Sequence, residues 1–213
     1  MKKRGIYVFD LDGTLVDSMP YFTRGILSVA DEWGIKYTGE LIKILTPLGS
    51  RGRAEYYINE LGVDEPVDDL VKKFENRLYK EYSTNIKPKA GVGEYLTSLH
   101  SEGARLFVLT ASPHLVTDVC LRVNGLYDLF EQIWSVDDFG LKKDGTELFF
   151  KVTQKIGCLP SDVQYFDDSL IALTNAGKAG YRTYGVFDNH SQEDLCRMRS
   201  IAQETVMTFE DLL

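Results

Sequence analysis

The sequence predicts an α/β protein in which a parallel β-sheet is interrupted by an all-helical insert. Two observations support this fold class. Short apolar runs rich in β-branched and aromatic residues alternate with segments of helical periodicity from residue 89 onward, an alternation typical of a parallel sheet covered by helices. Residues 16–88, which follow the first apolar run directly, contain helical patterns and no convincing strand.

Five apolar runs are the expected strands of this sheet. They cover residues 5–9, 105–109, 132–136, 163–166 and 182–187, and the run at 132–136 is the weakest of them. Each run is followed by an aspartate or a threonine. Because open α/β sheets place their functional sites at the carboxyl ends of the strands, these polar residues mark the expected site.

Helical periodicity and turn residues define the segments between the strands. Val92, Leu96 and Leu99, for example, share one helical face. The expected helices of the sheet region cover residues 91–101, 113–124, 146–156 and 169–179, and those of the insert cover 20–33, 39–45, 53–61 and 66–82. We therefore predict a sheet domain made of residues 1–15 and 89–213, and a helical domain made of residues 16–88.

Composition narrows the range of functions. The chain carries 24 Lys and Arg against 32 Asp and Glu, a net charge of −8, which argues against nucleic-acid binding because that function usually needs a basic face. The apolar run at 5–9 is too short for a signal peptide or a membrane span. The three cysteines show no metal-binding spacing. We expect a cytoplasmic protein without a membrane partner, and we favour a monomer.

The segment Asp-Leu-Asp-Gly-Thr at residues 10–14 carries the strongest functional signal. Two carboxylates follow an expected strand, and Gly13 allows the chain to turn sharply after them. One carboxylate can act as a nucleophile while the other exchanges a proton with the leaving group. Repulsion between two close carboxylates also favours a divalent cation.

Three later segments complete a set of motifs: Leu-Thr-Ala-Ser at 109–112, Lys-Lys-Asp-Gly-Thr-Glu-Leu-Phe at 142–149, and Asp-Asp-Ser at 167–169. With these motifs the chain resembles the haloacid dehalogenase superfamily of phosphotransferases over nearly its whole length. The resemblance implies that Asp10 is the nucleophile that attacks phosphorus. It also implies that Asp12 acts first as general acid and then as general base.

The same resemblance assigns the remaining site residues. Thr110 and Lys143 are the implied phosphate-binding residues, with Lys142 as the competitor of Lys143. Asp168 is implied to coordinate Mg²⁺ with Asp167 in support, and Asp10 and Asp12 complete the implied metal site.

One position departs from the pattern Gly-Asp-Ser-x-x-Asp of many relatives. Ala172 stands where their second carboxylate lies, three residues after the serine. Asp167 replaces the usual glycine and can restore the missing negative charge. The polar residue Asn175 lies one helical turn further on.

The resemblance implies a Rossmann-like three-layer sandwich with a parallel sheet, plus a small all-helical cap domain. The implied reaction is Mg²⁺-dependent hydrolysis of a small phosphate monoester, a phosphorylated metabolite, through an aspartyl-phosphate. Two alternatives stay open: a sugar-phosphate mutase similar to β-phosphoglucomutase, and a catalytically weak module that binds a phosphorylated ligand, which Ala172 would explain. Arg51 and Arg53 lie where related caps carry a substrate-specificity loop, and either is a candidate to contact a distal anionic group.

Overall fold

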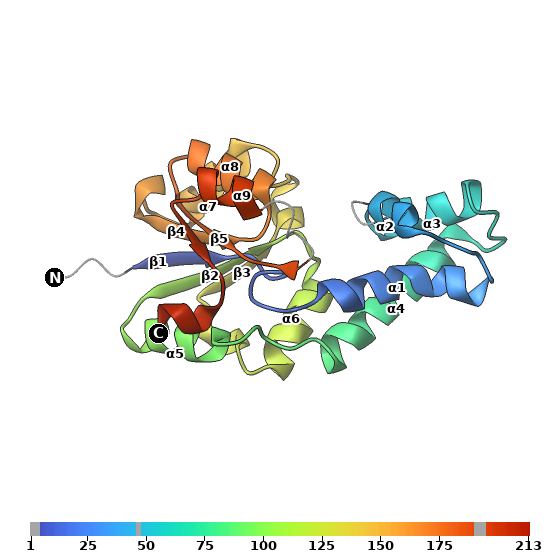
Figure 1. The fold of residues 1–213 in the computed structure, drawn as a ribbon, viewed down its shortest axis with the longest axis horizontal. Coiled ribbons are helices and arrows are strands. Elements are labelled where there is room, and N and C mark those ends of the chain that lie inside the picture. The colour runs from blue at the N-terminus through green and yellow to red at the C-terminus, as the bar shows by residue number, and fades with distance from the viewer. Residues whose placement is uncertain (1–4, 46–47, 190–194) are drawn as a thin grey trace. The chain divides into compact units, whose positions relative to one another are not determined.

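The computed structural model describes residues 5–45, 48–189 and 195–213, and these divide into two compact units (Figure 1). The core unit contains the chain up to Asp17 together with Lys87–Leu213, and the insert unit is Ser18–Ile86. The predicted helical domain, residues 16–88, begins and ends slightly outside the insert unit.

A six-stranded sheet lies at the centre of the core unit. Its strands are β1 (Ile6–Phe9), β2 (Arg105–Thr110), β3 (Gln132–Ser135), β4 (Val163–Asp167), β5 (Arg182–Val186) and β6 (Glu204–Val206). Their order is β3-β2-β1-β4-β5-β6, and all neighbours pair in parallel. The predicted α/β class is thereby confirmed. Strand β1 lies between β2 and β4, with Phe9 in register with Val108 and Phe166.

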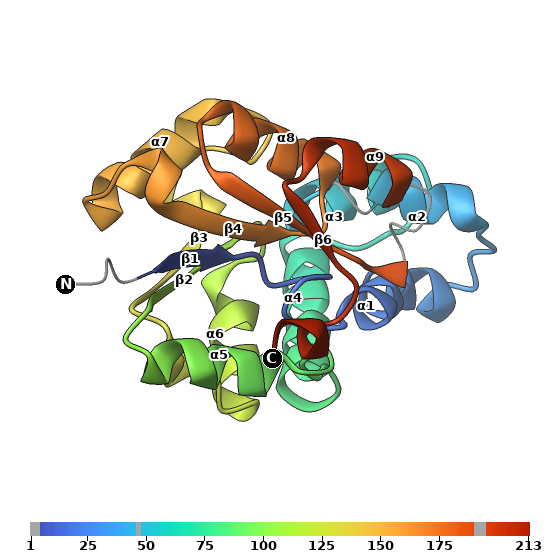
Figure 2. The same ribbon diagram turned by 60° about the vertical axis from the view of Figure 1, so that its left-hand side comes forward.

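Helices cover both faces of the sheet, as Figure 2 shows. The helices α7 (Thr146–Ile156), α8 (Leu170–Lys178) and α9 (Leu195–Ile201) lie on one face, and α5 (Val92–Ser101) and α6 (His114–Val123) lie on the other. Short 3₁₀ turns occur at Tyr127–Leu129, Val136–Phe139, Pro160–Asp162 and Phe209–Leu212. This arrangement is the predicted three-layer sandwich.

The described residues of the insert unit form helices and connecting loops, with no strand among them. Its helices are α1 (Met19–Glu32), α2 (Gly39–Leu45), α3 (Ser50–Asn59) and α4 (Val67–Thr84). They enclose their own hydrophobic core, in which the buried Tyr57 hydroxyl donates a hydrogen bond to the Ile26 carbonyl oxygen at 2.8 Å. Among the described residues of the whole chain, no helix has the length and apolarity needed to cross a membrane.

Two elements differ from the sequence prediction. Strand β6 was not predicted, because three residues are too few for an alternating pattern to be recognised; backbone pairing to β5 holds it, and the Phe187 N–H extends that pairing to the Val206 carbonyl oxygen at 2.8 Å. The helix expected at 53–61 begins earlier, at Ser50, so Arg51 lies in its first turn rather than in a loop.

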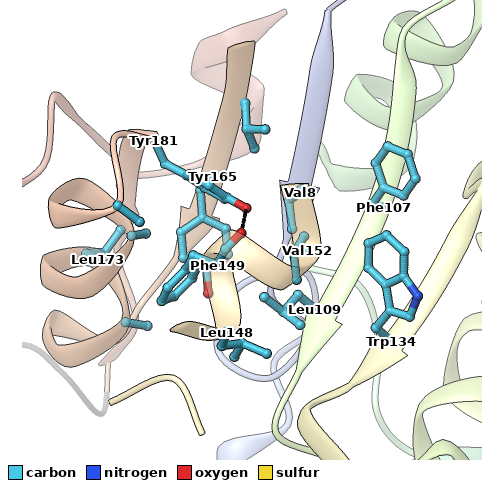
Figure 3. Close-up of a cluster of buried hydrophobic side chains, with 14 of the residues drawn as sticks. Val8, Phe107, Leu109, Trp134, Leu148, Phe149, Val152, Tyr165, Leu173 and Tyr181 are labelled. Carbon is cyan, nitrogen blue, oxygen red and sulfur yellow. Dashed lines mark hydrogen bonds between the residues drawn. The ribbon is translucent and has the colours of Figure 1, made fainter. Parts of the chain in front are cut away.

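A buried aromatic cluster joins α7 and α8 to the sheet (Figure 3). The Phe149 ring meets the rings of Tyr165 and Tyr181 edge-on, with centroids 5.3 Å and 5.5 Å away. The Tyr181 hydroxyl donates to the Phe149 carbonyl oxygen at 2.7 Å, and Leu173 of α8 packs against the same cluster. Such close packing gives the end of β4 a rigid support.

This packing predicts the effect of truncating one side chain of α8. Leu173→Ala should lower the free energy of unfolding by about 2–5 kcal/mol, because it leaves a cavity beside the sheet. Ile171→Ala is the matched control, since Ile171 lies on the same helix with 61% of its surface exposed, and its effect should stay within about 0.5 kcal/mol. Urea unfolding followed by circular dichroism measures both; equal losses would contradict the assigned packing.

Candidate active site

The loop at residues 10–14, which we call the acidic loop, follows the central strand β1 directly. The Asp10 N–H donates to the Phe166 carbonyl oxygen at 2.8 Å, so strand pairing continues to Asp10 and carries it to the carboxyl edge of the sheet. Gly13 has a φ of +76°, and a Cβ at this position would lie 2.5 Å from Asp168 Oδ2. A glycine is therefore required where the loop turns and passes Asp168.

Three carboxylates converge at this edge of the sheet: Asp10, Asp167 and Asp168. One oxygen of each lies within 4.8 Å of the others. They come from the ends of β1 and β4, which are neighbours in the sheet. Mg²⁺ prefers carboxylate oxygens as ligands, so the donor set fits this ion.

Lys143 is the cation of the cluster. Its Nζ lies 2.5 Å from Asp10 Oδ1 and 2.8 Å from Asp167 Oδ2, and its side chain is 12% exposed. The Asn175 side chain holds the loop that carries Lys143, because its Nδ2 donates to the Lys143 carbonyl oxygen at 3.3 Å. Lys142, the competing candidate, is an exposed residue.

Asp167 is held by donors on both carboxylate oxygens. The Ser169 N–H donates to Oδ1 at 2.7 Å, while Lys143 and the Tyr165 hydroxyl both donate to Oδ2. Ala172 is fully buried in the hydrophobic cluster behind this site. The cluster of carboxylates thus includes one from position 167 and none from position 172.

Burial and repulsion disfavour the negative charges of the cluster. Burial raises the pKa of Asp10 to about 7; repulsion from Asp167 and Asp12 adds to this, while Lys143 opposes it. Burial, followed by repulsion from Asp167 and Asp10, raises the pKa of Asp168 well above its ordinary value. Burial by itself would lower the pKa of Lys143, but attraction to Asp10 and Asp167 outweighs it and raises that pKa. The surplus negative charge favours an added cation.

A second network joins the loops after β1 and β2. Thr110, which is fully buried at the end of β2, accepts a hydrogen bond on Oγ1 from the Ser112 N–H at 3.0 Å. The Ser112 hydroxyl donates to Asp12 Oδ2 at 2.6 Å. The structure therefore connects Asp12 to Thr110 through Ser112, a residue whose side chain the sequence analysis did not single out.

Lys89 is a further residue that sequence reasoning missed. Its Nζ lies 2.8 Å from Oδ2 of the buried Asp188, and it donates to the carbonyl oxygens of Phe187, at 2.9 Å, and Gly13. Its backbone N–H donates to the Leu15 carbonyl oxygen at 3.0 Å. One ammonium group thus ties the acidic loop to the end of β5.

The two arginines of the insert unit differ in environment. Arg51 is exposed and forms an ion pair with Asp68 at 2.7 Å. Arg53 is buried: its guanidinium lies over the Phe22 ring, 5.0 Å from the centroid, and donates to the Leu45 carbonyl oxygen at 3.2 Å. Burial lowers the pKa of Arg53 to about 10, so it remains charged at neutral pH.

Carboxylates gathered at the carboxyl edge of a parallel sheet lie where α/β proteins place their functional sites, and this donor set fits a divalent cation. Residues 7–186 match the family of haloacid dehalogenase-like hydrolases, and the chain belongs to that family. The resemblance stated from the motifs is confirmed.

Similar proteins include two bacterial phosphatases. The chain is 26% identical to a phosphorylated carbohydrates phosphatase of Thermotoga maritima, over 88% of this chain and 86% of that protein. It is 28% identical to a phosphoglycolate phosphatase of Nitrosococcus oceani, over 85% of this chain and 83% of that protein. The crystal structure of CbbY from Rhodobacter sphaeroides in complex with phosphate shares the fold, with a TM-score of 0.82 and 19% identity over 99% of this chain and 96% of that one.

The Lys89–Asp188 pair yields a stability prediction. Lys89→Met should cost about 3–5 kcal/mol in unfolding free energy, because it takes the ammonium from a buried carboxylate. The double variant Lys89→Met with Asp188→Asn should recover at least about half of that loss, since the buried charge is then removed as well. Urea titrations of the two single variants and the double variant complete the cycle; strictly additive losses would contradict the pairing.

Proposed function

We propose that this enzyme is a Mg²⁺-dependent phosphatase that hydrolyses a small phosphorylated metabolite through an aspartyl-phosphate on Asp10. The observation that carries the proposal is the difference between the two aspartates of one loop. Asp10 is buried against the Lys143 ammonium, whereas Asp12 accepts a hydrogen bond from a neutral hydroxyl. Lys143 lowers the pKa of Asp10 against the effect of burial, and a bound cation would lower it further, which suits an ionised nucleophile. The Asp12 carboxyl, held by a hydroxyl, suits the acid–base group.

The reaction then follows in two displacements. A carboxylate oxygen of Asp10 attacks phosphorus, the bond from phosphorus to the leaving oxygen breaks, and Asp12 gives its proton to that oxygen. Asp12, now ionised, takes a proton from water while the water oxygen attacks phosphorus. The bond between phosphorus and Asp10 breaks, which releases inorganic phosphate and restores both side chains.

Phosphoryl transfer depends mainly on positioning and charge stabilisation. Lys143 and Thr110 are proposed to bind the non-bridging oxygens of the phosphoryl group. The segment between β2 and α6 supports this role, because the free N–H groups at the start of a helix attract anions.

The proposed Mg²⁺ ligands are Asp10 and Asp168, with Asp167 and the segment at Asp12 in support. When bound, the ion supplies positive charge that offsets repulsion between the carboxylates and the phosphoryl oxygens. Asp167 already accepts hydrogen bonds from Lys143, Tyr165 and Ser169. We therefore propose that Asp167 contributes more by holding Lys143 in place than by binding the ion.

Arg51 is the better candidate for substrate specificity in the insert unit. Its ion pair with Asp68 is exposed, and such pairs contribute at most about 1 kcal/mol, so a substrate anion can replace the aspartate. Arg53, in contrast, is held by burial, by the Phe22 ring and by a backbone carbonyl. We assign it a structural role in the insert unit.

The first test is phosphate release from 2-phosphoglycolate, glycerol 3-phosphate and hexose 6-phosphates in the presence of Mg²⁺. Wild type should release phosphate from at least one of them, and Asp10→Asn should lower kcat by more than about 1,000-fold. Asp10→Asn should keep or raise the thermal stability, because it removes a charge from a repulsive cluster.

Three outcomes separate the candidate functions. Release that requires both Mg²⁺ and Asp10 supports the phosphatase. Isomerised hexose phosphate without net phosphate release would support the mutase instead. Ligand binding without any turnover would support the binding module.

The contact between Tyr165 and Asp167 gives a second kinetic prediction. Tyr165→Phe should lower kcat/KM about 10-fold, because Asp167 then holds Lys143 less firmly. Tyr181→Phe is the matched control: it removes a buried hydroxyl that donates to Phe149 in the same aromatic cluster, so it should cost about 1 kcal/mol of stability and leave kcat/KM unchanged. Equal kinetic losses in both variants would show that Tyr165 acts only through packing.

A further inference from the structure

We propose that Ser112 is a positioning residue whose hydroxyl orients the Asp12 carboxyl for proton exchange with the leaving oxygen. The inference rests on the proposed function, because it assigns a role within that site. Ser112 and Asp12 are 100 positions apart in the sequence, yet Ser112 Oγ lies 2.6 Å from Asp12 Oδ2. The distance is that of a short hydrogen bond between two oxygen atoms.

The backbone of Ser112 is held on both sides. Its N–H donates to Thr110 Oγ1 at 3.0 Å, and its carbonyl oxygen accepts a hydrogen bond from Thr117 Oγ1 at 3.5 Å. Thr110 and Thr117 are themselves buried, at the end of β2 and in α6. Two hydroxyls from regular elements thus fix the backbone from which the Ser112 side chain reaches Asp12.

A serine hydroxyl suits an acid–base carboxyl better than a charged partner does. Proton exchange requires Asp12 to be protonated in one displacement and ionised in the next. An ammonium would favour the ionised form, because opposite charges attract. A hydroxyl can donate to the ionised carboxylate and accept from the protonated carboxyl, so it restrains the rotation of the group in both forms.

Leaving groups of different acidity separate this role from a merely structural one. A positioned general acid contributes about 10²- to 10⁴-fold when the leaving group is an alkoxide. A 2,4-dinitrophenolate leaves without a proton and needs no such acid. A loss confined to the alkyl ester is therefore the signature of a misplaced Asp12.

The experiment measures kcat/KM for the best alkyl phosphate of the panel and for 2,4-dinitrophenyl phosphate. Ser112→Ala should lower the first about 10- to 100-fold and the second by less than about 3-fold. Asp12→Asn provides the reference pattern of selective loss. Ser112→Thr keeps the hydroxyl and should restore the alkyl ester rate to within about 3-fold of wild type. Ser101→Ala, the matched control, removes a serine hydroxyl that donates to the Ser98 carbonyl oxygen at the exposed end of α5, and it should leave both rates unchanged.

Several results would overturn the assignment. An equal loss on both esters would mean that Ser112 binds the phosphoryl group or supports the loop, and no loss on either would mean that it has no role. If Ser112→Ala does not fold, Ser112→Cys replaces it, since the thiol is a weak donor of similar size, and the same selective loss is expected. A wild type inactive on both esters would overturn the proposed function, and this inference with it.

Discussion

Repulsion among three carboxylates at the end of the central strand is the constraint on which the rest of the core unit depends. Asp10, Asp167 and Asp168 have oxygens within 4.8 Å of one another, and one ammonium, that of Lys143, reaches two of them. Like charges brought so close in a partly dry environment are costly unless cations offset them. The fold must therefore hold the cluster together against this repulsion.

The hydrophobic packing of the sheet provides that restraint. Tyr165 belongs to the aromatic cluster through its ring and to the charged cluster through its hydroxyl, which donates to Asp167. Lys89 performs a similar task on the other side of the acidic loop, where it links Gly13 to Asp188. The charged side chains are thus positioned by residues with buried contacts, and the loops that carry them have little freedom to separate.

Much of this arrangement could be predicted from the sequence because it depends on local patterns. Apolar runs that end at Asp10, Thr110 and Asp167 predict strands whose carboxyl ends meet at one edge, and the structure places those ends there. Lys89 and the Ser112 hydroxyl gave no such signal, because their partners are distant in the sequence and no periodicity marks them. Strand β6 escaped prediction since it consists of three residues and depends on pairing with β5.

Thermal stability measured at increasing Mg²⁺ concentration tests most directly whether a cation offsets the repulsion among the three carboxylates. At a pH above the Asp10 pKa of about 7, Mg²⁺ at 100 times its dissociation constant should stabilise wild type by about 2.7 kcal/mol. Asp168→Asn should lose this stabilisation, whereas Asp144→Asn, which removes an exposed carboxylate beside Lys143 in the sequence, should keep it. Unchanged stability of wild type in saturating Mg²⁺, or equal stabilisation of the Asp168→Asn variant, would contradict the account.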